Sequence, residues 1–221
     1  MRVCLADRPG AIGAVATALG AAGADIAALK VIDRADGVAV DDLVVETALP
    51  VAALRRLVER VSGVTVEAVT RGGEELKLTA TCLAAAVAED RAHPVTTLVA
   101  GLPEAIGARW AVAVDPGPGG LAVVASSPGA PVVPAGLRLP SVAAGRPRRL
   151  PHAAWMPAEW RHAGGERLEM AAAAIGGPGS AVLVARGGGP RFRVPELRRL
   201  DELCRIAVAV GAVAAPPKVR I

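Results

Sequence analysis

Six consecutive residues near the start of the chain, Asp7-Arg8-Pro9-Gly10-Ala11-Ile12, have the types and spacing of a small anion-binding corner. They follow an apolar stretch, Val3-Cys4-Leu5-Ala6, and lead into a segment with apolar residues at helical spacing. Gly10 accepts a positive φ or a close backbone approach, and Pro9 fixes its own φ. The first amides of the expected helix then point outward without partners, an arrangement that suits a carboxylate.

The elements that position this corner follow the order β-α-β-β-α-β, which periodicity and turn residues indicate by themselves. The expected strands are 2–6, 25–33, 38–47 and 64–69, and the expected helices are 10–22 and a second one that starts at Pro50 and ends at Gly63. Asp36-Gly37 is a hairpin signal between the second and third strands. This order predicts a ferredoxin-like fold, with one sheet and two helices on one of its faces.

The same region resembles the ACT domain, a small regulatory module that usually senses amino acids. The resemblance covers residues 1–72 and rests on three motifs in order: the corner above, Gly20-Ala21-Ala22-Gly23-Ala24-Asp25-Ile26, and Gly37-Val38-Ala39-Val40-Asp41-Asp42-Leu43-Val44-Val45. It implies that the turn amides hold the α-carboxylate of a ligand, often against the start of the second strand in a partner subunit. Asp25 then meets the ammonium group, although the family often has Asn there.

The resemblance therefore predicts an amino-acid site and a homodimer formed through this domain. The predicted ligand-binding residues are Asp7, Arg8, Pro9, Gly10, Ala11, Ile12, Asp25 and Ile26. The alternative is that Asp25 only begins a strand and that the domain only dimerises.

A second domain is expected over residues 74–215, after the Gly-rich joint at 71–74. The expected helices are one through Leu76, Thr79, Leu83 and Val87 that closes at His93-Pro94, then 95–106, 166–175 and a closing helix from Glu196 to Pro216-Pro217. The expected strands are 110–114, 121–125 and 181–185, and residues 126–165 have no clear pattern. The order resembles the GAF domain, a small-molecule-sensing and dimerising fold, with the closing-helix residues Phe192, Glu196, Leu200, Ala207 and Val208. It implies an α/β/α sandwich, so the whole chain is expected to be an α+β protein.

The Pro/Gly-rich segment 126–165 predicts a lid over an apolar pocket, since long loops in compact domains usually form binding walls. Trp155 or Trp160 is expected at its mouth, and Arg146, with Arg148 and Arg149, at its rim. His152 and His162 lie in the same segment, but the spacings typical of zinc sites are missing. The sequence thus predicts no metal and no cofactor.

Composition and charge argue against a nucleic-acid-binding protein. The net charge of +4 divides into −1 over residues 1–72 and +5 over the remainder, yet Arg198 and Arg199 alternate with acidic residues and aromatics are only 2%. A nucleic-acid partner is therefore not expected. Alanine is abundant and suits either face of an element, which weakens arguments from periodicity.

Cysteine usage and the lack of a targeting signal predict a cytoplasmic protein. Cys4, Cys82 and Cys204 lie far apart among apolar neighbours, which favours buried inert thiols in a reducing compartment. Asp7-Arg8-Pro9 interrupts any signal peptide, and the apolar run 206–215 is too short to span a bilayer.

The predicted function is ligand-responsive regulation by a protein without catalysis of its own. No serine has a Gly-x-Ser-x-Gly context, and no catalytic residue is predicted. Two other classes stay open: an enzyme with a cleft lined by residues 126–170, and a purely structural dimerisation protein.

Overall fold

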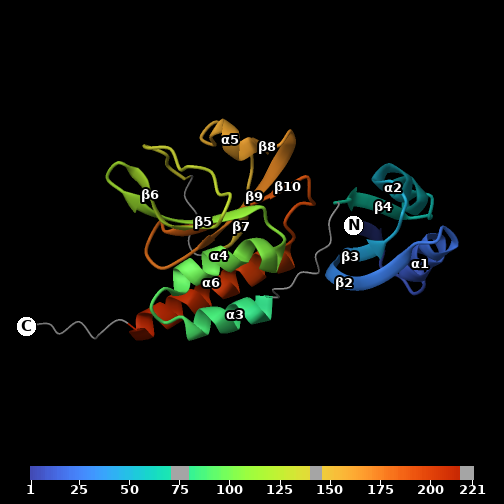
Figure 1. Cartoon of the computed structure of the whole chain (residues 1–221), viewed down its shortest axis with the longest axis horizontal. Helices are drawn as coiled ribbons and strands as arrows, with labels where there is room; N and C mark the ends of the chain where they lie inside the picture. The colour runs from blue at the N-terminus through green and yellow to red at the C-terminus, as the bar shows by residue number, and fades with distance from the viewer. Residues whose placement is uncertain (71–79, 140–145, 215–221) are drawn as a thin grey trace, which may run out of the picture. The chain divides into compact units, whose positions relative to one another are not determined.

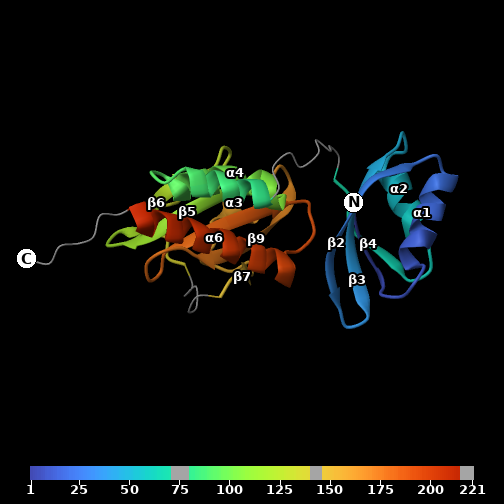
Figure 2. The same ribbon diagram turned by 90° about the horizontal axis from the view of Figure 1, so that it is seen from below.

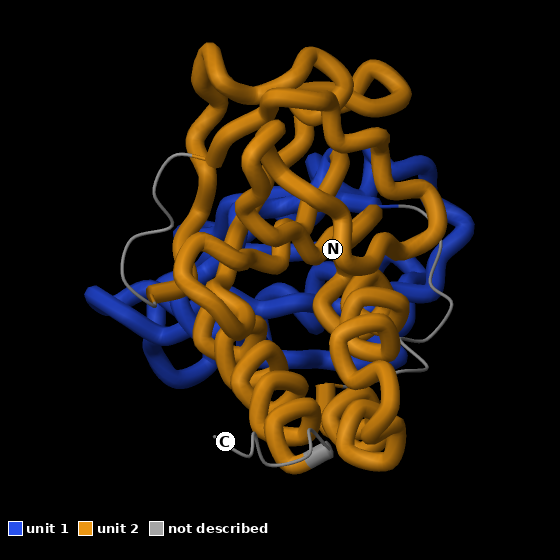
Figure 3. Tube along the Cα trace, turned by 90° about the vertical axis from the view of Figure 1, so that its left-hand side faces the viewer, with its two compact units in different colours: residues 1–74, 188–195 blue, residues 75–187, 196–221 orange. Residues whose placement is uncertain are grey.

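The computed structural model describes residues 1–70, 80–139 and 146–214. The chain divides into two compact units (Figure 3): unit 1 comprises residues 1–74 and 188–195, and unit 2 comprises residues 75–187 and 196–221. The described residues form a mixed α+β protein with six helices and two antiparallel sheets, one of four and one of six strands. The joint expected at 71–74 and the closing prolines expected at 216–217 lie outside the described residues.

Unit 1 has the predicted order of strands and helices. Its elements are β1 (Arg2–Ala6), α1 (Ala11–Ala21), β2 (Asp25–Ala35), β3 (Val38–Glu46), α2 (Val51–Glu59) and β4 (Val64–Ala68). The sheet order is β2-β3-β1-β4, and both helices lie on one face of the sheet (Figures 1 and 2). The predicted hairpin is confirmed: Asp36 and Gly37 have φ of 53° and 74°, as a two-residue primed turn requires. Pro50 is the N-cap of α2, one residue before the expected position.

The core of unit 1 lies between this sheet and the two helices. Inward-facing residues of β1 and β3 meet one apolar stripe from each helix, and the buried members include Val3, Leu5, Val15, Leu19, Leu43, Leu54 and Val58. None is aromatic, so aliphatic side chains alone fill this core. It holds β1 and the start of α1 together, and with them the loop between the two.

Unit 2 starts with α3 (Ala80–Glu89) and α4 (Pro94–Ile106), which agree with the predicted helices where those residues are described. The predicted residues Leu76 and Thr79 fall in the stretch that is not described. The remaining elements are β5 (Trp110–Gly117), β6 (Gly120–Ser126), β7 (Arg148–Leu150), α5 (Ala158–Arg161), β8 (His162–Ala163), β9 (Glu166–Ala174), β10 (Ala181–Gly187) and α6 (Val194–Ala214). The sheet order is β6-β5-β10-β9-β7, with β8 paired to β9.

The helix predicted over 166–175 is wrong, because this segment is strand β9. It pairs with β10 in an unbroken register from Ala181↔Ala174 to Gly187↔Leu168. Its alanines at 171–173 are all fully buried, because the strand is covered on both faces. A short apolar run of this kind cannot be told from a buried helix by periodicity, and alanine favours the helix.

The two faces of the larger sheet are covered differently. Helices α3, α4 and α6 lie together along one face (Figures 1 and 2). On the other face, Trp110, Leu183 and Met170 form a core with Met156 and Trp160 from the irregular segment. The second helical layer of the expected α/β/α sandwich is thus largely irregular chain, and α5 is the one helix among the described residues of that segment.

Candidate functional site

The loop between β1 and α1 is tied to the hairpin that joins β2 and β3. The Asp7 amide donates to the Gly37 carbonyl at 2.9 Å, and the Arg8 amide donates to the Ala6 carbonyl at 2.9 Å. The loop therefore turns sharply off the end of β1 and is fixed by main-chain bonds.

Gly10 sets the direction in which α1 leaves this loop. It has φ 83° and ψ −8°, a left-handed conformation, and it occupies the N-cap position without a side-chain cap. A Cβ at residue 10 would meet no atom within 4 Å. Glycine is thus needed here for its backbone angles and not for space.

The N-terminus of α1 presents unpaired donors. The Ala11 amide donates to the Arg8 carbonyl at 3.2 Å and the Ala14 amide to the Gly10 carbonyl at 3.0 Å. Within the described residues, the amides of Gly10, Ile12 and Gly13 have no backbone acceptor. Together with the helix dipole, three such N–H groups favour a carboxylate or another small anion.

Asp25 and Ile26 lie at the opposite end of the sheet from this loop. The register pairs Asp25 with Glu46 and Ala35 with Val38, and Val38 pairs in turn with Ala6, just before the loop. The length of β3 therefore separates the start of β2 from the loop, which is roughly 26 Å at the usual rise per residue. Within one chain the structure does not bring these predicted site residues together.

Asp41 is a candidate site residue that the sequence does not single out. It is only 4% exposed, and its Oδ1 has no hydrogen-bond partner within the described part of the chain. Burial raises the pKa of the Asp41 carboxyl, the charge of Arg34 opposes that rise, and Asp42 and Asp7 add to it. A signal was present in the sequence: in the two-residue period of β3, Asp41 falls between the core residues Ala39 and Leu43.

The surroundings of Asp41 are partly apolar and partly charged. Val31 lies directly opposite Asp41 across the β2–β3 pair, Leu29 lies opposite Leu43, and both β2 side chains are 46% exposed. Arg34 forms an exposed ion pair with Asp7 at 3.6 Å, a contact of little energetic weight. Because Asp7 and the buried Asp41 outnumber Arg34 here, an ammonium group is the better match for this region.

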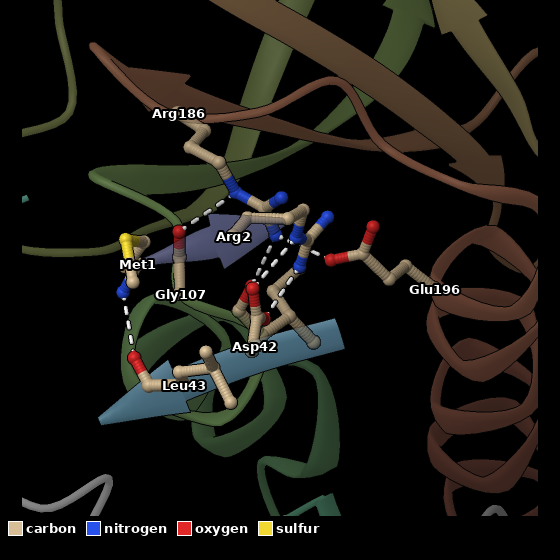
Figure 4. A network of polar contacts seen from close by, with 8 residues as sticks. Met1, Arg2, Asp42, Leu43, Gly107, Arg186 and Glu196 are labelled. Carbon is tan, nitrogen blue, oxygen red and sulfur yellow. Dashed lines mark hydrogen bonds and ion pairs between the residues drawn. The ribbon is translucent and has the colours of Figure 1, made fainter. Parts of the chain in front are cut away.

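The start of β1 is anchored to β3 by a polar network (Figure 4). Arg2 donates from Nε to Oδ1 of Asp42 at 2.8 Å and from Nη2 to Oδ2 at 2.7 Å. The Met1 nitrogen donates to the Leu43 carbonyl at 2.7 Å. Arg2 is 4% exposed, so this bidentate pair fixes the register of the strand that leads into the loop.

The tryptophans predicted at a pocket mouth occupy different environments. Trp160 is completely buried, and its ring centroid lies 5.8 Å from that of Trp110 in the core of unit 2. Trp155 is half-buried and Arg146 is exposed. A cavity of about 670 Å³ does exist in unit 2, but none of these three residues is among the described residues that line it.

Metal-ligating side chains do not converge in the parts of the chain that the structure describes. No group of three His, Cys, Asp or Glu residues there is close enough to hold an ion. His152 bonds through Nε2 to the Leu168 carbonyl at 2.6 Å, and its ring centroid lies 6.3 Å from that of His162.

The sequence predicts that all three cysteines are buried, but the structure shows that they are not. Cys204 is fully buried and burial raises its pKa to about 12, so its thiol stays protonated. Cys4 is half-buried, and Cys82 is exposed on α3. The expectation of three buried thiols is therefore wrong for Cys82, whose helix face points away from the core residues Leu83 and Val87.

Comparison with known proteins gives no family assignment: no protein-family model matches the chain, and a search of curated proteins finds no significant match. Across the described residues, every helix is too short or too polar to cross a membrane.

Proposed function

We propose that unit 1 is an amino-acid-binding module of the ACT type and that the protein is a ligand-responsive regulator without catalysis of its own. The element order and the sheet order β2-β3-β1-β4 support a ferredoxin-like arrangement for this unit. The observation that carries the proposal is the uncapped N-terminus of α1 behind Gly10, where three amides have no backbone acceptor in the described residues.

The proposed ligand is an α-amino acid whose carboxylate accepts hydrogen bonds from these amides. Its ammonium group is attracted by the carboxylates of Asp7 and the buried Asp41, and its side chain contacts exposed Val31 or Leu29. Asp25 can pair with the ammonium group only if a second copy of the chain supplies it, because Asp25 lies at the end of its own sheet that is far from the loop.

A homodimer through unit 1 is part of the proposal. Strand β2 has 11 residues and lies at an edge of the four-stranded sheet, with apolar side chains exposed beside that edge. Such an edge is a natural pairing surface for a second copy. Ligand binding then biases the association or arrangement of the subunits.

Unit 2 we assign to a GAF-like type. Two helices, a hairpin, an irregular segment, two paired strands and a long closing helix support this assignment. The wide spacing of the three cysteines, with no Cys-x-x-Cys pair, supports a cytoplasmic setting.

The test is a thermal-shift screen of the intact protein against the twenty amino acids. A ligand that binds only the folded state stabilises it by about 2.7 kcal/mol at one hundred times its Kd, so a selective rise in melting temperature is expected. If no amino acid raises the melting temperature, the proposal is rejected in favour of a scaffold. Chemical turnover of the stabilising ligand would instead identify an enzyme.

Gly10→Ala tests the location of the site. A left-handed backbone costs an L-residue about 1–2 kcal/mol, so the loop is expected to change its angles and the ligand-induced shift to disappear. The matched control is Gly20→Ala in the same helix, where a Cβ also meets no atom within 4 Å. It should raise stability by about 0.5–1 kcal/mol and keep the ligand response. Equal ligand responses in both variants would place the site elsewhere.

A further inference from the structure

Unit 2 contains a cavity of about 670 Å³ at one end of its sheet, a size within the usual range for small-molecule sites. Three chain segments line it: the β5–β6 hairpin, residues 137–139, and the connection from β9 to β10. All three belong to unit 2, so this cavity is separate from the candidate site in unit 1.

Main-chain contacts fix the wall that residues 137–139 contribute. The Leu121 amide donates to the Leu137 carbonyl at 3.1 Å, and the Gly136 amide donates to the Gly119 carbonyl at 2.9 Å. A Cβ on Gly120 would lie 2.8 Å from the backbone of Gly136, so only glycine permits this approach. The hairpin and the segment are thus joined closely enough to form one side of a pre-formed cavity.

The described part of the lining combines apolar side chains with a single charge. Six apolar residues face the cavity: Pro116, Leu121, Leu137, Leu139, Ala174 and Pro178. Arg138 is the one charged residue among the described lining residues, and it makes no ion pair or hydrogen bond with the rest of the described chain. A cation without a counter-ion beside an apolar concavity favours an anionic ligand.

We propose that this cavity binds a small molecule with an apolar body and one carboxylate, which pairs with the guanidinium of Arg138. The guanidinium can donate two parallel hydrogen bonds to a carboxylate, while the leucines and prolines cover the apolar body. The ligand is therefore an aliphatic or similar apolar acid, chemically different from the amino acid proposed for unit 1.

The proposal is tested by calorimetric titration of the intact protein with octanoate. Arg138→Gln should weaken octanoate binding about 10- to 150-fold, the usual worth of hydrogen bonds to a charged group. The matched control is Arg149→Gln, which removes an exposed arginine from β7 in the same unit and should leave the affinity unchanged. Neutral 1-octanol should bind wild type and Arg138→Gln alike.

A second variant fills the cavity without touching the charge. A Cβ on Gly177 would meet only the Oγ of Ser180, at 3.6 Å, so Gly177→Leu should fold normally and occupy the cavity. It is expected to abolish octanoate binding while the melting temperature of the free protein stays near the wild-type value.

Any one of the following results would overturn the proposal. They are no binding of octanoate to the wild type, unchanged affinity in Arg138→Gln, unchanged affinity in a folded Gly177→Leu, and inorganic phosphate that binds as tightly as octanoate. Octanoate binding should persist in Gly10→Ala, and loss of binding there would place octanoate in unit 1 and reject this site. Failure of the amino-acid screen has no bearing on any of these outcomes.

Discussion

Two neighbouring aspartates of β3 show how strongly one residue's environment decides its role. Successive strand residues point to opposite faces, so Asp41 and Asp42 are separated by the sheet. Asp42 accepts both hydrogen bonds of a bidentate pair with Arg2. Asp41 is buried with an Oδ1 that has no hydrogen-bond partner in the described residues. Asp42 therefore stabilises the fold, and Asp41 is the carboxylate that we propose for the ammonium group of the ligand.

Asp41→Asn and Asp42→Asn should therefore change stability in opposite directions. Burial raises the folded-state pKa of Asp41 above its ordinary value of 3.8, so the folded protein holds the extra proton and loses stability as the pH rises through the raised value. Asp41→Asn should be more stable than wild type at neutral pH, and the gain should disappear as the pH falls below 3.8. Asp42→Asn should lose about 1–3 kcal/mol at neutral pH.

The measurement is the free energy of unfolding in urea from about pH 3 to about pH 8, followed by far-ultraviolet circular dichroism. Asp41→Asn should also weaken the amino acid found in the screen by about 1–3 kcal/mol. A variant that is less stable than wild type at neutral pH would show that Asp41 has a stabilising partner.

The candidate site could be predicted from the sequence only in part. The loop Asp7–Ile12 was found because Pro9 and Gly10 mark a turn at the junction of two periodicities. The resemblance places Asp25 at the same site from a partner subunit, and that placement stays a prediction. Within one chain, its distance from the loop follows from β1 and β2 running parallel, which local sequence does not reveal. Asp41 was missed because its importance comes from burial, a property of the packed sheet.

At the scale of elements, a buried ion pair joins three parts of unit 2. Arg186 at the end of β10 donates from Nη2 to Oε1 of Glu196 in the first turn of α6 at 2.9 Å (Figure 4). It also donates to the carbonyls of Ile106 and Gly107, at 2.6 Å and 3.0 Å, where α4 ends. One side chain thus caps α4 and holds the start of α6.

Arg186→Ala should destabilise unit 2 by about 3–5 kcal/mol, because it leaves Glu196 buried without that cation. The three tryptophans of the chain all lie in unit 2, so tryptophan fluorescence during urea unfolding reports this unit. The control Arg198→Ala removes an exposed arginine of α6 and should change stability by no more than about 0.5 kcal/mol. Equal effects of the two variants would show that the ion pair has no structural weight.

Most elements were predictable because amphipathic patterns and turn residues coincide, as they do at Asp36-Gly37 and at His93-Pro94. Strand β9 was not predictable, because pairing with β10 and β7 makes it a strand, whereas its own alanine-rich sequence favours a helix. The contribution of Trp160 to the core was hidden for a related reason. The irregular segment covers a sheet face, and that covering depends on contacts distant in sequence.

At the scale of the whole molecule, the proposed regulation requires more than one copy of the chain. Sedimentation of the intact protein at micromolar concentration should give a dimer or a larger species. Val31→Lys should shift the protein toward the monomer, because it places a charge beside the edge of β2.

The control for this shift is Val124→Lys, which alters a residue of similar exposure on β6 in unit 2. It should leave the sedimentation coefficient unchanged. A monomeric wild type would contradict the dimer, and a monomer produced only by Val124→Lys would assign the interface to unit 2.

The return of residues 188–195 to unit 1 limits how this protein can be divided. Arg193 from that segment forms an ion pair with Glu67 of β4 and approaches the sulfur of Cys4 on β1 at 3.7 Å. A gene fragment that encodes residues 1–74 therefore lacks residues 188–195, which belong to unit 1. A fragment that begins at residue 75 encodes this segment without the rest of unit 1. Exchange of either module by a single crossover would separate Arg193 from Glu67, so recombination is expected to transmit the two units together.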